Sequence, residues 1–280
     1  MQAAVEDLVQ LARDGNREAL EALIRQIQDR VYGLALRMLG TPADAEDATQ
    51  EILIRIVTRL DSFRGESRFT TWSYRVAVNH LLTTRKRRAE KGAMSFEEHL
   101  AWVEREIAAD SQAPLPDIEW GLVEREARLV CIQSLLLCLS RSERIAYVLS
   151  DVFDLNSREA AYVLDITPAA FRKRVSRARG SLLTFLSRHC RHIDAENRCD
   201  CGRVAPLAVR AQAIDPAALT FVQHPCHAAE PELPDDYLEQ MDALQRMAVL
   251  FKSHPDYAAP DGCVEPLREL ISDGRVAFFQ

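Results

Sequence analysis

The chain has 280 residues, of which 48% are hydrophobic, and its 35 Lys and Arg against 42 Asp and Glu give a net charge of −7. This length and apolar content suffice for an ordinary core and exclude a disordered or fibrous protein. No stretch approaches the roughly 20 apolar residues of a membrane helix, and the N-terminus lacks the pattern of a secretory signal. We therefore expect a cytoplasmic protein, in which the odd number of 7 cysteines does not form a disulfide framework.

The charges are distributed unevenly along the chain. Residues 61–92 carry 8 Lys and Arg against 3 Asp and Glu, and residues 127–188 carry 10 against 5, whereas residues 213–280 carry 4 against 12. Because salt screens charge over about 10 Å, a phosphate backbone responds to the local potential more than to the net charge. The two basic blocks are therefore candidate nucleic-acid surfaces, and the acidic segments are candidate linkers, covers or partner surfaces.

Apolar residues recur at the spacing of three and four that is typical of amphipathic helices. In the N-terminal part this pattern predicts helices over residues 5–12, 17–39, 43–60 and 69–88. Turn residues lie between the first three helices, and the fourth ends in Arg85-Lys86-Arg87-Arg88, where cations favour a helix C-terminus. We expect residues 1–92 to form a compact helical bundle.

Residues 93–121 lose this periodicity and gain acidic side chains, which predicts an acidic linker with at most partial helix. Helical patterns return over residues 122–139, 142–152 and 157–164, and Ser157 is the expected cap of the last. Thr167 suits an N-cap and Pro168 the first position of a further helix. Residues 122–188 therefore have the outline of a helix-turn-helix domain.

The helix that follows Thr167 has two contrasting faces. Its apolar face carries Phe171, Val175, Ala178 and Leu182. Its opposite face carries Arg172, Lys173, Ser176, Arg177 and Arg179. A helix fits the major groove of DNA, where early side chains reach base edges and later cations meet phosphates. The alternative is an ordinary solvated basic face, but the cap, the turn and the short preceding helix favour DNA binding.

Residues 63–80 interleave aromatic and cationic side chains, a composition that can stack unpaired bases and neutralise their backbone at once. Trp72 and Tyr74 are the central aromatic residues of this stretch. The alternative for both is a place in the core, because most aromatic side chains of helices pack inward.

In their order and spacing, these features resemble the extracytoplasmic-function group of bacterial sigma factors over residues 5–187. The resemblance lies in residues 14–20, in residues 44–51 before an apolar helix, in residues 63–79 with Thr71-Trp72 and Asn79, in Arg85 to Arg88, and in residues 139–144 before the helix-turn-helix. It implies an all-α, non-enzymatic subunit that gives RNA polymerase its promoter specificity, opens the DNA and initiates transcription. Its partners would be core RNA polymerase, promoter DNA and an anti-sigma factor or a self-inhibiting extension.

The resemblance also implies roles for individual residues. Asp47, Gln50 and Glu51 would contact core RNA polymerase. Residues implied at the opened minus-10 element are Arg68, Trp72, Tyr74, Arg75, Asn79, Arg85 and Arg87. Residues implied at the minus-35 element are Thr167, Arg172, Lys173, Ser176 and Arg177. The competing hypothesis is a helix-turn-helix regulator that binds DNA without core polymerase, and it leaves residues 43–79 without a purpose.

Residues 189–280 extend beyond the resemblance and hold five of the seven cysteines. Cys190, Cys199 and Cys201 could bind zinc or another metal ion, with further ligands among His189, His192, His224, Cys226 and His227. The alternatives are a reducible thiol switch and cysteines of purely structural use. An enzyme with a catalytic metal is a third class of function, although the sequence shows no phosphate loop, nucleophile elbow or paired carboxylate motif. Cys131 and Cys138 are expected in the core.

An acidic amphipathic stretch follows over residues 234–251. It is either a further packed helix or a regulatory lid that covers basic DNA-binding surfaces until a signal moves it. We therefore expect two helical domains, residues 1–92 and 122–188, and a mostly helical extension over residues 189–280.

Overall fold

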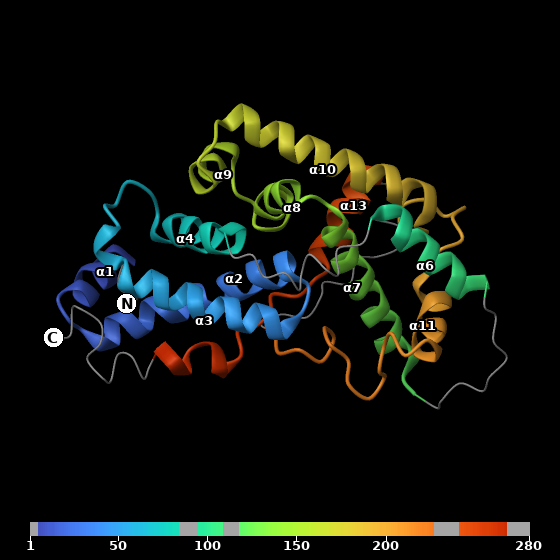
Figure 1. The fold of residues 1–280 in the computed structure, drawn as a ribbon, viewed down its shortest axis with the longest axis horizontal. Helices are drawn as coiled ribbons and strands as arrows, with labels where there is room; N and C mark the ends of the chain where they lie inside the picture. Colours follow the sequence, from blue (N-terminus) through green and yellow to red (C-terminus); the bar gives the residue numbers. More distant parts are fainter. Residues whose placement is uncertain (1–4, 84–94, 109–117, 227–240, 268–280) are drawn as a thin grey trace. The chain divides into compact units, whose positions relative to one another are not determined.

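The computed structural model describes residues 5–83, 95–108, 118–226 and 241–267 (Figure 1). Within these residues the fold is built of helices, and Cys190 and Cys199 form an isolated β-bridge. The all-α prediction is confirmed. The chain forms two compact units, which are described separately: residues 1–86, 156–171 and 256–280 make unit 1, and residues 87–155 and 172–255 make unit 2.

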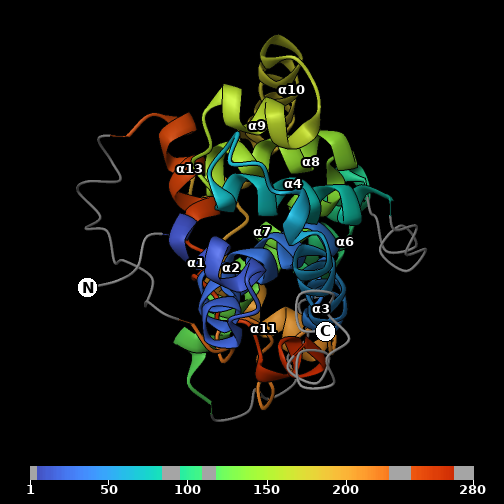
Figure 2. The same cartoon turned by 90° about the vertical axis from the view of Figure 1, so that its left-hand side faces the viewer.

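Unit 1 contains the four N-terminal helices that the sequence predicts. They are α1 (Val5–Arg13), α2 (Arg17–Leu39), α3 (Pro42–Thr58) and α4 (Phe69–Thr83), with the short η1 (Leu60–Ser62) before α4. Asn16 caps α2 by accepting a hydrogen bond from the backbone N–H of Ala19, and Gly40 ends it in the left-handed conformation with φ 92°. Figure 2 shows α2 and α3 side by side, and their apolar faces form the core of this unit.

Unit 1 also contains α9 (Ser157–Leu164), the first turn of α10 (Pro168–His189) and η3 (Asp261–Cys263). The structure corrects the expected cap of α9. Asn156, and not Ser157, is the N-cap: its side-chain oxygen accepts from the N–H groups of Arg158 and Glu159, while Glu159 accepts from the backbone of Asn156. This reciprocal arrangement gives hydrogen-bond acceptors to the backbone N–H groups of Asn156, Arg158 and Glu159. The helix therefore begins with Ser157 as its first residue.

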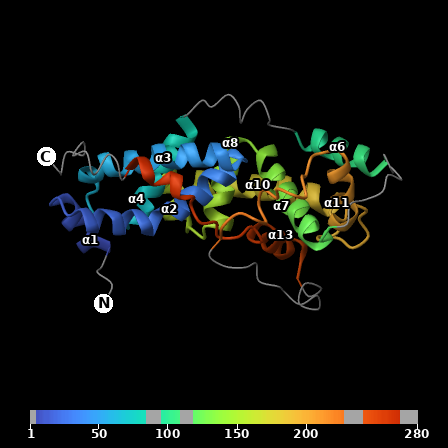
Figure 3. The same ribbon diagram turned by 90° about the horizontal axis from the view of Figure 1, so that it is seen from below.

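Unit 2 holds the remaining helices. They are α6 (Phe96–Ala108), α7 (Trp120–Cys138), α8 (Arg141–Tyr147), the π-helical η2 (Val148–Val152), most of α10, α11 (Cys201–Arg210) and α13 (Ala243–Lys252). The segment expected as an acidic linker thus contains the 13-residue helix α6. Figure 3 shows α6, α7 and α11 side by side.

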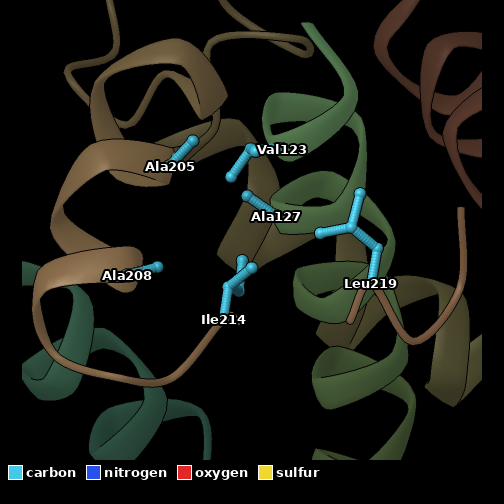
Figure 4. Packing of buried hydrophobic residues seen from close by; sticks show 6 residues of the cluster. All are labelled: Val123, Ala127, Ala205, Ala208, Ile214 and Leu219. Carbon is cyan, nitrogen blue, oxygen red and sulfur yellow. The ribbon is translucent and has the colours of Figure 1, made fainter. Parts of the chain in front are cut away.

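A small apolar cluster joins the extension to α7 (Figure 4). Val123 and Ala127 of α7 meet Ala205 and Ala208 of α11, and Ile214 and Leu219 complete the cluster from the following loop. The small alanines allow the two helices to approach closely, so residues 201–219 share a core with the helix that precedes the helix-turn-helix. No helix among the residues described here is long and apolar enough to cross a membrane.

Candidate functional site

The start of α10 presents a polar and cationic surface. Thr167 caps the helix, since its hydroxyl accepts a hydrogen bond from the backbone N–H of Ala170 at 3.1 Å. Phe171, Val175, Ala178 and Leu182 are buried, as predicted for the apolar face. The side chains of Arg172, Lys173, Ser176 and Arg177 are exposed. The helix therefore offers three cations on the side opposite its packed face.

Arg179 differs from the other cations of this face. Its Nη2 lies 2.9 Å and its Nε 3.0 Å from Oδ1 of Asp151, whose side chain is only 8% exposed. Burial raises the pKa of Asp151, and the charge and hydrogen bonds of Arg179 counteract the rise. Arg179 consequently links α10 to η2.

The predicted polymerase-contacting residues lie along α3. Asp47 and Glu51 are exposed, and Gln50 is half-buried. The Gln50 side chain donates a hydrogen bond to the carbonyl oxygen of Gly262 at 2.9 Å, and Oε2 of Glu51 lies 3.7 Å from Nε2 of His80. Three polar side chains of one helix thus form a continuous patch, one edge of which the C-terminal part of the chain already contacts.

The aromatic residues at the start of α4 pack against one another. The ring of Phe63 lies 5.6 Å from those of Phe69 and Trp72, and Phe69 stacks on Trp72 at 5.8 Å. Trp72 is 7% exposed and Tyr74 is 4% exposed. Both belong to the core of unit 1 in this structure, which agrees with the packing alternative and differs from the role at the minus-10 element, because a buried ring offers no face to a base.

The remaining predicted minus-10 residues differ in their surroundings. Arg68 and Asn79 are exposed. Arg75 is engaged within unit 1: its guanidinium donates to the carbonyl oxygen of Tyr162 and to Oδ1 of Asp165, both at 3.1 Å, and lies 4.8 Å from the centroid of the Tyr162 ring. Arg85 and Arg87 lie outside the described residues.

The cysteines of the extension lie beside a cavity in unit 2. This cavity has a volume of about 210 Å³ and is lined mainly by apolar side chains of α6, α7 and α11. Cys131, Cys199 and Cys201 lie on its wall together with His99. Sγ of Cys131 is 3.7 Å from Nε2 of His99, and Sγ of Cys201 is 3.5 Å from Nε2 of His192.

These thiols influence one another electrostatically. Burial raises the pKa of Cys131 well above its usual value, and the thiols of Cys201, Cys190 and Cys199 raise it further. Burial and the neighbouring Cys190 likewise raise the pKa of Cys199 to about 11. These thiols are therefore protonated at neutral pH. Because the thiolate is the nucleophilic form of cysteine, they react weakly.

The sequence placed Cys131 in the core and gave His99 no role. Cys131 is half-buried and belongs with the thiols of the extension, 59 or more positions further along the chain. Spacing along the sequence could not reveal this, because the contact depends on α11 packing against α7. Among the described residues, however, no three His, Cys, Asp or Glu side chains are grouped as a metal site requires. The metal at Cys190, Cys199 and Cys201 therefore stays a prediction of the sequence.

The acidic stretch expected as a helix or a lid is described only from residue 241 onward. Its described part contains α13, which packs by Met247, Leu250 and Phe251. The ring of Phe251 meets that of Tyr147 edge to face at 5.1 Å, and Lys252 pairs with Asp154 at 2.8 Å. This segment is a packed helix of unit 2, and residues 234–240 lie outside the described part.

Comparison with known proteins assigns both helical regions to one family. Residues 23–91 match Sigma-70 region 2, and residues 129–182 match Sigma-70, region 4. The ECF RNA polymerase sigma factor SigW of Bacillus subtilis is 29% identical over 187 residues, which are 65% of this chain and 96% of SigW. The ECF RNA polymerase sigma-E factor of Escherichia coli is 29% identical over 178 residues, 62% of this chain and 90% of that protein.

A solved structure of the sigma factor RpoE with the anti-sigma factor NepR from Bartonella quintana is also similar, with 18% identity and a TM-score of 0.42 over 60% of this chain and 96% of that one. The two sequence relatives leave about a third of this chain uncovered. Both family regions occur in the order expected of a sigma factor, and the second includes the first two thirds of α10. The chain belongs to the extracytoplasmic-function group of RNA polymerase sigma factors.

Proposed function

We propose that this sigma factor uses three separate surfaces for its partners. The exposed cations at the start of α10 would read the minus-35 element, and Asp47, Gln50 and Glu51 of α3 would hold core RNA polymerase. The observation that carries the proposal is the division of α10 into a packed apolar face and an exposed cationic face. A helix of this kind can enter the major groove without disturbing its own domain.

At the minus-10 element, Arg68 before α4 and Asn79 on α4 would make the contacts, since their side chains are exposed. Trp72 and Tyr74 would support this surface from within, because their burial ties α4 to the core of unit 1. Arg75 would reach DNA only after leaving Tyr162 and Asp165. Its exposed ion pair is a weak restraint, so this exchange is feasible.

The sigma factor would perform no covalent chemistry of its own and would act in the cytoplasm, where its polymerase transcribes. The side chains assigned here bind and orient macromolecules: carboxylates and an amide face a protein, and cations face phosphates and base edges. A thiol that acts as a nucleophile or redox group is favoured by a pKa lowered toward neutral pH, whereas burial raises the pKa of Cys131 and Cys199.

The polymerase surface is tested by charge reversal. In the full chain, Asp47→Lys with Glu51→Lys should weaken binding to core polymerase at least tenfold, because two carboxylates of one patch become cations that the partner surface repels. Glu18→Lys on α2 is a control charge reversal at another exposed position, with half the total change in charge. Fluorescence titration with labelled core polymerase measures the affinities. Equal affinities of the double variant and the control would refute the surface.

The extension would tune this activity through its attachment to α7. Cys199 and Cys201 stand where α11 begins, at the cavity beside α7, so a change in their chemistry would alter how the extension packs. Replacing both by Ser should change promoter output severalfold in reconstituted transcription. If the sequence-predicted metal exists, protein purified under reducing conditions carries about one zinc-like ion per chain, and the double variant loses it. An anti-sigma factor would be a further, separate control.

A further inference from the structure

The last described segment of the chain, residues 256–267, packs in unit 1 against the N-terminal helices. We call it the docked segment. Its side chains Tyr257, Cys263 and Leu267 are 1%, 1% and 2% exposed, values of a folded core. Its short helix η3 lies beside α3, as Figures 1 and 3 show. A segment of the extension has therefore become part of the sigma region 2 fold.

Specific hydrogen bonds hold the docked segment to two helices. The backbone N–H of Ala259 donates to Oδ1 of Asp29 on α2 at 2.8 Å. The side chain of Gln50 on α3 donates to the carbonyl oxygen of Gly262 at 2.9 Å. The charges of Glu46 and Asp29 act on the buried Cys263 thiol and, after burial itself, raise its pKa further. Contacts to α2 and α3 thus flank the buried side chains.

The contact with Gln50 gives the docked segment its significance. Gln50 lies on α3 between Asp47 and Glu51, the two carboxylates of the polymerase patch, and its amide is already used by Gly262. A partner that covers this patch needs the Gln50 side chain and the space beside it. The N–H that Gln50 donates to Gly262 is not available to polymerase, and the docked segment occupies the surface beside it.

We propose that the docked segment competes with core RNA polymerase for the α3 surface, so that the chain lowers its own affinity for polymerase. This inference rests on the proposed role of Asp47, Gln50 and Glu51. The segment is tethered to the surface it covers, so its effective concentration is high and weak contacts suffice to keep it bound. Polymerase binds the fraction of molecules in which the segment is released, and the apparent dissociation constant rises in inverse proportion to that fraction.

The test releases the segment in the full chain. Tyr257→Glu with Leu267→Glu places two carboxylates in buried positions of the segment and leaves α3 unchanged. Asp29→Ala is a milder variant that removes the acceptor of the Ala259 N–H. Gly262→Ala is the matched control, because a Cβ at this position meets no atom within 4 Å and the carbonyl that Gln50 uses is retained.

We expect the double variant to bind core polymerase at least about fivefold more tightly than the wild type, Asp29→Ala to bind to an intermediate extent, and Gly262→Ala to bind as the wild type does. A synthetic peptide of residues 256–267 should weaken polymerase binding by the double variant. If the double variant loses its helical circular dichroism, Asp29→Ala and the peptide decide the question.

Unchanged or weaker binding by the folded release variants, with no effect of the peptide, would overturn the proposal. This failure differs from failure of the polymerase surface itself. If reversal of Asp47 and Glu51 weakens binding while release of the segment does not strengthen it, the surface stands and the competition falls. If reversal of the charges of Asp47 and Glu51 leaves polymerase binding unchanged, the proposed polymerase surface is refuted, and the proposed competition with it.

Discussion

Both oxygens of the Glu126 carboxylate accept a hydrogen bond from the backbone N–H of Phe221, at 3.1 and 3.0 Å. The N–H groups of Thr220 and Val222 complete the arrangement, donating to the same carboxylate at 2.8 and 2.9 Å. Glu126 is 2% exposed on α7, so a buried charge is compensated by three consecutive amides. One side chain thereby fixes the loop of the extension to α7.

Removing this carboxylate should detach the loop. In Glu126→Ala the buried amide of Phe221 loses its acceptor, and we expect a loss of about 2 kcal/mol in the free energy of unfolding. Proteolytic cleavage should increase within residues 215–226 before the whole chain unfolds. Urea unfolding and limited proteolysis measure these effects. Replacement of the exposed Glu104 of α6 by Ala is the control, and equal stability of the two variants would show that the loop is held by other contacts.

The cationic face of α10 should act on duplex DNA without contributing to the fold. Arg172→Ala and Arg177→Ala each remove an exposed side chain, and we expect each to weaken binding to upstream promoter duplex by about 1 to 3 kcal/mol while the unfolding midpoint stays unchanged. Arg179→Ala is the informative comparison. Because Arg179 pairs with the buried Asp151, its loss should lower stability instead. A stable Arg179→Ala that binds DNA poorly would reassign this cation to the interface.

Trp72 should behave as a core residue. We expect Trp72→Ala to cost about 3 to 5 kcal/mol of stability, because it leaves a cavity beside the rings of Phe63 and Phe69. Trp72→Phe preserves an aromatic partner and should cost clearly less. Thermal unfolding followed by circular dichroism measures both. If Trp72→Ala is as stable as wild type but fails to open promoter DNA, as judged by permanganate reactivity of thymines, the ring acts directly on the extruded bases.

Alkaline pH should destabilise unit 2 through Cys138. Burial, helped by the negative charges of Glu97 and Glu98, raises the pKa of this thiol from 9.0 to about 11, although Arg144 opposes the rise. The folded state holds the proton more tightly than the unfolded state, so the stabilisation is complete below about pH 9 and is lost as the pH rises through about 11.

Cys138→Ala removes this titration. Between about pH 9 and about pH 11, the free energy of unfolding of the variant should therefore fall less steeply than that of the wild type. Replacement of the exposed Cys226 by Ala is the control. Parallel pH profiles of the wild type and Cys138→Ala in urea unfolding would contradict the argument.

Local patterns predicted most of the helices. The apolar spacing and the turn residues located α1 to α4 and α7 to α10, and the Thr167 cap with Pro168 located the start of α10 to the residue. These features depend on neighbours in sequence, which a pattern contains. The role of Asn156 as cap could not be separated from that of Ser157, because both residue types suit the position.

Contacts between distant segments were not predictable in this way. Nothing in the spacing around Cys131 indicates Cys199 or Cys201, and nothing near Gln50 indicates Gly262, 212 positions away. Likewise, an aromatic and cationic stretch has the same composition whether Trp72 faces a base or the core. Contacts between distant residues and the orientation of Trp72 depend on how the helices pack, which a local sequence pattern does not contain.

The helix α10 is continuous from Pro168 to His189, and its hydrogen-bond pattern extends to Cys190, whose N–H donates to the carbonyl of Leu186. Arg172 and Cys190 are 18 residues apart, which is about five turns and about 27 Å of helix, so both project from the same side of one stiff rod. A rotation of the helix at Cys190 would therefore also rotate the exposed side chain of Arg172, which is proposed to contact DNA. One residue inserted between them would rotate Arg172 by about 100° about the helix axis relative to Cys190. Arg172 would then no longer project from the side of α10 from which Cys190 projects.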